Sequence, residues 1–330
     1  MTAGPVAPGL AEFRAAARRL ASHLRPTPCT LSSALTKLAG VPVWLKHEHL
    51  QTTGAFKLRG ATNAVLQLPE GVAGVTTAST GNHGRALAHA AKARGLNAVI
   101  CMSRLVPENK RAAVTALGAE ARIIGDSQDD ALIEAERLVR DEGFALIPPF
   151  DHPHVIAGQA TLGLEMADAV PDAASVLVPL SGGGLLAGVA AAMKARNPAL
   201  QVIGISMERG AAMAESLKAG HPVDVHERAT LADSLGGGIG LENRLTFSLV
   251  RGLLDEVILL NEAEIAAGIR HLYLREAQVV EGGGAVGVAA LLAGKYRPEG
   301  PVVLPLTGAN IDPALLDRII AGQTPDLETE

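Results

Sequence analysis

Hydrophobic residues along the chain form short unbroken runs, and between these runs apolar positions recur every three or four residues. The runs are rich in Val, Ile and Leu and show no polar alternation, which is typical of strands buried on both faces. They predict strands at 41–46, 72–77, 98–102, 121–124, 145–147, 176–180, 202–205, 257–260 and 302–306. The intervening periodicity predicts helices at 59–67, 85–94, 110–117, 128–142, 185–195 and 262–276. This alternation indicates an α/β fold with largely parallel sheets, either one wide sheet or two smaller ones.

Composition excludes several classes of protein. The 330 residues are 48% hydrophobic, which is too apolar for a disordered chain. The net charge is −5 and the aromatic residues are few (5 Phe, 2 Tyr, 1 Trp), so we expect no nucleic-acid partner. No apolar run approaches the ~20 residues that cross a membrane. Two cysteines make neither a disulfide framework nor a cysteine-based zinc site, which favours the cytoplasm.

Lys57 lies in the first of four stretches rich in glycine and small residues, at 52–61. Thr52 or Thr53 is expected to cap a helix beginning near Ala55, which places Lys57 in the first helical turn. The helix dipole there disfavours an ammonium group and makes the amine a better nucleophile or base. The alternative is a solvated surface lysine.

The second stretch, Ser79-Thr80-Gly81-Asn82-His83-Gly84, follows a predicted strand and opens a helix. Its amides and hydroxyls can form a nest for a carboxylate or phosphate, and an ordinary capped turn is the alternative.

The third stretch runs from Ser181 to Gly188 and places three glycines between a strand and a helix, an arrangement that binds anions. It also satisfies G-x-G-x-x-A, with Glu208 about 20 residues further on, so a dinucleotide site is a rival interpretation. In the fourth stretch, 306–310, Thr307 follows a strand and points its hydroxyl from the carboxyl edge of the sheet, unless the segment only caps a helix ahead of Pro313.

Metal and hydrolase sites are poorly supported. The paired histidines His47 with His49, and His152 with His154, lack a nearby third ligand. A G-x-S-x-G motif is absent.

Taken in order, the four stretches resemble the fold-type II pyridoxal-phosphate enzymes of the threonine dehydratase and serine racemase group, from Arg25 to Asn310. The resemblance implies a fold like the β subunit of tryptophan synthase, with two open, twisted, mostly parallel sheets flanked by helices. It also implies pyridoxal 5'-phosphate between a large domain (1–70 and 152–330) and a small one (71–151), and a homodimer.

The resemblance assigns roles to individual residues. Lys57 binds the cofactor covalently and is catalytic, Phe56 and Asn82 contact the cofactor ring, and Thr307 faces its pyridine nitrogen. Ser181, Gly182, Gly183, Gly184 and Leu185 hold the phosphate. Ser79, Thr80, Gly81, Asn82 and His83 grip the substrate carboxylate. Thr80 stands where racemases carry a second acid/base serine. Its hydroxyl can still move a proton, so the resemblance makes it catalytic, although its extra methyl disfavours racemisation.

Within this group, the segments 51–57, 149–153, 204–210 and 232–240 are similar to dehydratases of hydroxyectoine utilisation. This closer likeness implies a hydroxylated diaminobutyrate as substrate, with Asp233 as one candidate acceptor for its second amine. Ser206, Gly210 and Ala212 occupy the positions at which some members bind a divalent metal, so we expect none here.

We therefore predict a lyase that removes the β-hydroxyl and the amine of a hydroxy amino acid and releases a 2-oxo acid and ammonia. A general threonine/serine dehydratase or a racemase is the alternative within the group. An NAD-dependent oxidoreductase and a non-catalytic amino-acid-binding protein are alternatives from other classes.

Overall fold

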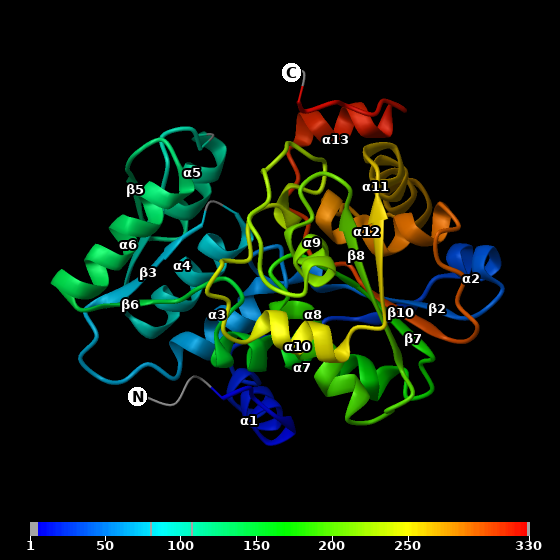
Figure 1. Ribbon diagram of the computed structural model, residues 1–330, viewed down its shortest axis with the longest axis horizontal. Helices are drawn as coiled ribbons and strands as arrows, with labels where there is room; N and C mark the ends of the chain where they lie inside the picture. The colour runs from blue at the N-terminus through cyan, green and yellow to red at the C-terminus, as the bar shows by residue number, and fades with distance from the viewer. Residues whose placement is uncertain (1–5, 80, 107, 329–330) are drawn as a thin grey trace.

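Two sheets organise the chain, for which a computed structural model describes residues 6–79, 81–106 and 108–328 (Figure 1). The larger sheet has the order β1-β2-β10-β7-β8-β9 and the smaller has the order β5-β4-β3-β6. All neighbouring strands are parallel except the pair β1 and β2. The strands are β1 Cys29–Leu31, β2 Val43–Lys46, β3 Gly74–Ala78, β4 Asn97–Met102, β5 Glu120–Ile123, β6 Phe144–Leu146, β7 Ser175–Pro179, β8 Gln201–Met207, β9 Glu256–Leu260 and β10 Val302–Pro305.

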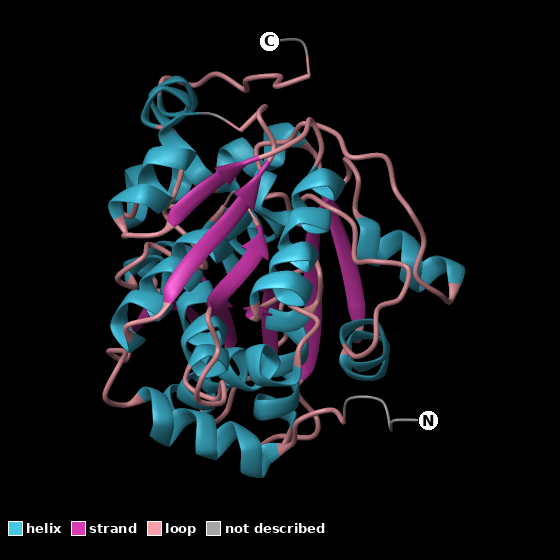
Figure 2. Cartoon of the chain, turned by 90° about the vertical axis from the view of Figure 1, so that its left-hand side faces the viewer, coloured by secondary structure: helices cyan, strands magenta, loops and turns pink. Residues whose placement is uncertain are grey.

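Helices cover both faces of the strands, as the view turned by 90° shows (Figure 2). The α-helices are α1 Leu10–Leu20, α2 Ser33–Ala39, α3 Lys57–Val65, α4 Asn82–Arg94, α5 Glu108–Ala116, α6 Gln128–Glu142, α7 Pro153–Ala169, α8 Gly184–Lys194, α9 Ala212–Ala219, α10 Thr246–Leu253, α11 Glu262–Glu276, α12 Gly282–Leu292 and α13 Pro313–Ile320. Two short 3-10 turns, η1 Glu48–Leu50 and η2 Asp233–Leu235, complete the elements. None of the helices in the described ranges is long and apolar enough to cross a membrane.

Strand β7 shows why the hydrophobic runs are unbroken. Val176 and Val178 pack in one core with α7 and α8, while Leu177 between them packs in a second core with α11 and α12. Alternate side chains of a strand point to opposite faces, so a sheet with a core on each face needs apolar residues at every position. The smaller sheet is built likewise, with α4 and α5 on one face and α6 on the other.

The predicted α/β architecture with two mostly parallel sheets is therefore confirmed, and each predicted strand has a counterpart within two residues. The prediction missed β1, a three-residue edge strand that is largely solvent-exposed. The strands of the smaller sheet lie between residues 74 and 146. The domain boundaries at 70/71 and 151/152 stay a prediction.

The two sheets stand side by side, with the smaller at the left of Figure 1. Segments that follow the carboxyl ends of β3, β7 and β10 line a common cavity. This is the edge at which open parallel sheets bind ligands.

Candidate active site

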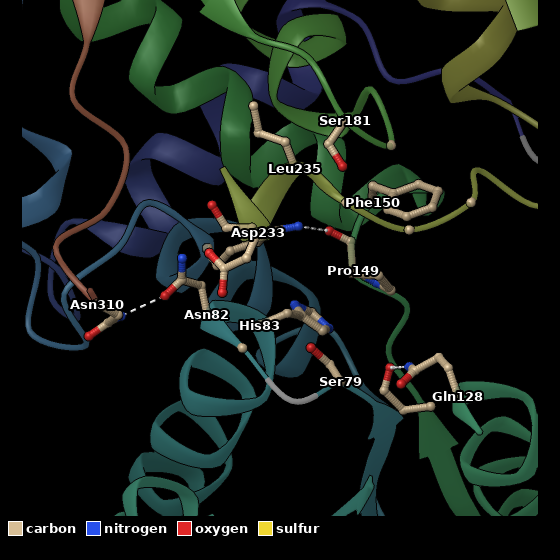
Figure 3. A pocket seen from close by; sticks show the side chains of 18 of the residues that line it. Ser79, Asn82, His83, Gln128, Pro149, Phe150, Ser181, Asp233, Leu235 and Asn310 are labelled. Atoms are coloured by element: carbon tan, nitrogen blue, oxygen red, sulfur yellow. Dashed lines mark hydrogen bonds between the residues drawn. The ribbon is translucent and has the colours of Figure 1, made fainter. Parts of the chain in front are cut away.

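A cavity of about 710 Å³ brings together the candidate residues that the sequence spreads over 250 positions (Figure 3). The predicted residues that line it are Phe56, Lys57, Ser79, Gly81, Asn82, His83, Ser181, Gly182, Gly183, Gly184, Leu185 and Thr307. Thr80 lies outside the described residues. The proximity of these residues is a finding, whereas their individual roles stay a proposal.

Helix α3 begins at Lys57 and so places this lysine in the first helical turn, as predicted. The cap is Phe56, which has helical backbone angles and makes no side-chain cap, so the expected Thr52 or Thr53 cap is wrong. A hydrogen bond to the segment after β10 fixes the start of the helix instead. The Phe56 amide donates to the carbonyl oxygen of Thr307 at 3.0 Å.

A buried network of ion pairs fixes the position of α3. Arg59 makes paired hydrogen bonds of 2.7 and 2.8 Å to Glu48 and of 2.6 and 2.8 Å to Glu165. Burial alone would raise the pKa of Glu48, but the charge and hydrogen bonds of Arg59 outweigh it and lower that pKa. Two carboxylates thus fix the residue that lies two positions after Lys57.

The Lys57 amine donates to the carbonyl oxygen of Pro149 at 2.8 Å and lies 5.4 Å from the centre of the Phe56 ring. Burial lowers the pKa of Lys57 to about 8. At pH 7 about a tenth of the amine is then uncharged, far more than for a lysine in water. The amine is a usable base and nucleophile, so the alternative of a solvated surface lysine is wrong, and burial, rather than the helix dipole, is the cause.

The turn from Ser181 to Leu185 is an anion cradle. Gly183 caps α8 with φ of 86°, a left-handed conformation that suits glycine. A Cβ at Gly182 would lie 2.2 Å from the ring of Phe150, so only glycine lets the chain pass. No acceptor among the described residues pairs with the amides of this turn, which therefore remain available to an anion such as a phosphate.

Asp151 stabilises a segment that packs against this turn. Its carboxylate accepts hydrogen bonds from the amides of Arg244, Leu245 and Thr246 at 2.7, 2.9 and 2.8 Å. These bonds tie the loop before α10 to the segment that carries Phe150, which packs against the glycines. Asp151 was not among the predicted site residues, although it lies in one of the quoted segments.

The dinucleotide interpretation fails on Glu208. This residue follows β8, but its carboxylate faces Lys295 at 3.6 Å and does not line the cavity. Glu208 therefore does not supply the acid that a dinucleotide fingerprint requires beside the glycine turn.

Asn82 takes part in a buried hydrogen-bond chain. Its amide donates to Glu281 at 2.7 Å and accepts from Asn310 at 2.6 Å, as the dashed line in Figure 3 marks for the latter. Burial, and then the charge of Asp233, raise the pKa of Glu281 to about 7. Glu281 was missed because a single Glu before three glycines gives no sequence signal.

His83 and Thr307 contribute neutral groups to the cavity wall. His83 Nε2 lies 2.8 Å from the carbonyl oxygen of Ile147, and burial, followed by the charge of Lys57, lowers its pKa to about 3. Thr307 is buried and its hydroxyl lies 3.5 Å from the carbonyl oxygen of Gly283. A hydroxyl rather than a carboxylate therefore occupies the end of β10.

Charged side chains from other segments also line the cavity. Lys110 of α5 and Asp233 form an ion pair at 3.2 Å between the two halves of the molecule. Glu227 also lines the cavity, and its carboxylate makes no hydrogen bond or ion pair with the described residues. Asp233, the predicted acceptor for a second substrate amine, is therefore already shared with Lys110.

Metal-binding side chains do not gather within the described ranges, where no group of three or more His, Cys, Asp or Glu residues is placed to hold an ion. Ser206 is buried and donates to the Met207 sulfur at 3.4 Å. The Nε2 atom of His47 forms a hydrogen bond with Thr30, and that of His49 forms one with Gln278.

Comparison with known proteins agrees with this geometry. Residues 20–308 match the family described as pyridoxal-phosphate dependent enzyme. A protein of Sinorhizobium fredii, provisionally named a threonine dehydratase, is 59% identical over 95% of both chains. The L-threonine ammonia-lyase of Thermotoga maritima is 40% identical over 94% of this chain and 78% of its own. The structure of maize serine racemase superimposes with a TM-score of 0.90 at 31% identity and covers 96% of this chain and 98% of its own.

Proposed function

Because the chain belongs to the pyridoxal-phosphate-dependent enzymes, we propose that it is a lyase that eliminates the β-hydroxyl and then the amine of a hydroxy amino acid. The products are a 2-oxo acid and ammonia. One observation carries this proposal: a half-buried lysine with a pKa lowered to about 8 faces the same cavity as an anion cradle made of free amides.

The residues present fit the cofactor. The Ser181–Leu185 turn offers amides to the phosphate, and its glycines leave room that a Cβ would fill. Lys57 would supply the amine for the covalent bond, and Phe56, Asn82 and Thr307, which line the same cavity, would contact the ring. When bound, pyridoxal phosphate supplies an electron sink that stabilises negative charge on the substrate α-carbon.

Lys57 then performs the proton transfer. With the cofactor and substrate bound, the free Nζ would accept the α-proton, because burial keeps part of the amine uncharged. The Ser79–His83 segment holds the substrate carboxylate through its amides and hydroxyls, which fixes the α-carbon near Nζ. The β-hydroxyl would take up a proton and leave as water, so the substrate must carry such a leaving group. Addition of water to the dehydrated product would then release ammonia and the 2-oxo acid.

The substrate that we propose is a hydroxylated diaminobutyrate, as in hydroxyectoine breakdown. Support comes from the resemblance of the segments 51–57, 149–153, 204–210 and 232–240, and from the unpaired carboxylate of Glu227 in the cavity wall. Glu227 is solvent-exposed, and its carboxylate would attract a second ammonium that reaches this part of the cavity. Glu227 was not among the predicted residues, and Asp233 would share its charge between Lys110 and the ligand.

Ammonia release from 3-hydroxy-2,4-diaminobutyrate, threonine and serine, assayed side by side, tests the substrate. We expect the highest kcat/KM for the diamino compound. Equal or better efficiency on threonine would reduce the protein to a general threonine dehydratase, and conversion of L-serine to D-serine would indicate a racemase. Replacing Glu227 by Gln should lower kcat/KM for the diamino compound only.

We also propose that the protein works as a homodimer in the cytoplasm. Support for the dimer is a group of exposed apolar side chains on neighbouring segments: Leu31, Leu50, Tyr273, Leu274 and Val279, which are 40–57% exposed. Hydrogen bonds from Ser32 to Glu276 and from His49 to Gln278 hold these segments together. Both cysteines are free, which suits a reducing compartment. Light scattering on the eluted protein should give twice the mass of 33.9 kDa.

A further inference from the structure

His83 is the second residue of α4, is 2% exposed and lies in the cavity wall (Figure 3). The carbonyl oxygen of Ile147, 2.8 Å from Nε2, can only accept, so Nε2 carries a hydrogen. Burial and the charge of Lys57 keep the ring neutral. Nδ1 therefore presents a lone pair, and this tautomer follows from the hydrogen bond.

The Nδ1 atom is buried and has no hydrogen-bond partner among the described residues. Buried polar atoms are nearly always paired, so an unpaired one in an active-site wall calls for a donor that arrives during function. A carboxylate cannot be that donor, because it too only accepts. The His83 side chain is therefore unsuited to the substrate carboxylate, and only its amide can serve that group.

Lys57 is the donor that the surroundings offer. Its charge acts on the His83 ring, and it ends in a flexible amine that donates to Pro149 in this structure. An uncharged amine has two hydrogens and one lone pair. The Pro149 carbonyl oxygen and His83 Nδ1 are two fixed acceptors. If each accepts one hydrogen of the amine, the lone pair of the amine can point in only one direction.

We propose that His83 is a positioning residue for Lys57, whose free amine donates one hydrogen to Nδ1 so that its lone pair points into the cavity. The inference rests on the proposed role of Lys57. It predicts that the ring affects how fast the amine reacts, and leaves the binding of the substrate carboxylate unchanged.

Two amide substitutions separate the two ends of the ring. His83→Asn places an oxygen on Cγ, where Nδ1 was, and gives up the bond to Ile147. His83→Gln places its amide where Nε2 was, keeps the bond to Ile147 and gives up the acceptor at Nδ1. The first measurement is the rate at which protein stripped of cofactor captures added pyridoxal phosphate, followed by absorbance across pH 6–10. The second is kcat and KM of the reloaded enzyme.

We expect His83→Gln to melt like the unaltered protein but to capture cofactor about 2- to 12-fold more slowly, with kcat lowered and KM unchanged. Its capture profile should shift to lower pH, because an acceptor on Nδ1 stabilises the ammonium form of Lys57. His83→Asn should melt earlier and capture cofactor at a nearly normal rate. Unaltered capture and an unaltered pH midpoint in His83→Gln would overturn the proposal, as would loss of capture in both variants in proportion to their lost stability. If the unaltered protein captures no cofactor, the proposed function fails instead.

Discussion

The glycine turn at the start of α8 gives a prediction that can be worked from the structure. Gly183 has φ of 86°, and a Cβ there would lie 2.8 Å from Val250 Cγ2 and 2.9 Å from Met213 Cε. Gly183→Ala therefore introduces two separate strains. The left-handed backbone costs about 1–2 kcal/mol for alanine. Overpacking against Val250 and Met213 costs about 1–3 kcal/mol more, and the turn relieves it by moving away from its neighbours.

Gly220 offers a matched control. It ends α9 with φ of 81°, but a Cβ there would meet nothing within 4 Å. Gly220→Ala carries the backbone strain alone, so both variants should lose about 1–2 kcal/mol of stability from that source. Only Gly183→Ala should displace the amides that we assign to the phosphate.

The assay is titration of cofactor-free protein with pyridoxal phosphate, read by visible absorbance. We expect the Kd of Gly183→Ala to rise roughly 5- to 150-fold if the overpacking is relieved at the expense of cofactor binding. The Kd of Gly220→Ala should stay within about twofold of the unaltered value. The same Kd in Gly183→Ala and the unaltered protein would refute the assignment of this turn to the phosphate.

Three further predictions concern titration, stability and metals. Burial raises the pKa of Glu281 to about 7, above its unfolded value, so the folded protein loses stability as pH rises from 4.5 to 7. Glu281→Gln should abolish that loss, and parallel melting profiles of the two proteins at pH 5 and pH 8 would contradict it. Arg59→Met removes the ion pair of the buried Glu48, whereas Glu165 keeps Lys46, and it should cost about 3–5 kcal/mol in urea unfolding. Arg140→Ala breaks an exposed pair and should change stability by less than about 0.5 kcal/mol, so equal losses in the two variants would refute the argument. Chelator treatment should leave the rate unchanged, and a loss restored by magnesium would show that a metal site was overlooked.

The architecture was predictable because the sheets bury both faces. That burial imposes apolar runs on the strands, and the runs are visible in one sequence. Helix α12 was missed because it opens with three glycines, a residue type that disfavours helices. A Cβ at Gly282 would lie 1.9 Å from the carbonyl oxygen of Leu231, so tight packing overrides propensity there.

The candidate site was predictable where several residues share one segment, as around Lys57 and in the Ser181–Leu185 turn. It was not predictable where single residues from distant segments meet. Asn82, Glu281 and Asn310 join across 228 positions of sequence, and only the fold brings them together. His83 Nδ1 has no hydrogen-bond partner among the described residues because of the neighbours that the fold places around it, and the sequence does not reveal these neighbours.

Borohydride reduction of the cofactor-loaded protein, followed by peptide mass spectrometry, tests the central claim most directly. The account predicts that one lysine, Lys57, carries the reduced cofactor, and that Lys57→Ala folds normally but takes up no covalent label. A label on a different lysine, or full ammonia release by Lys57→Ala, would contradict it.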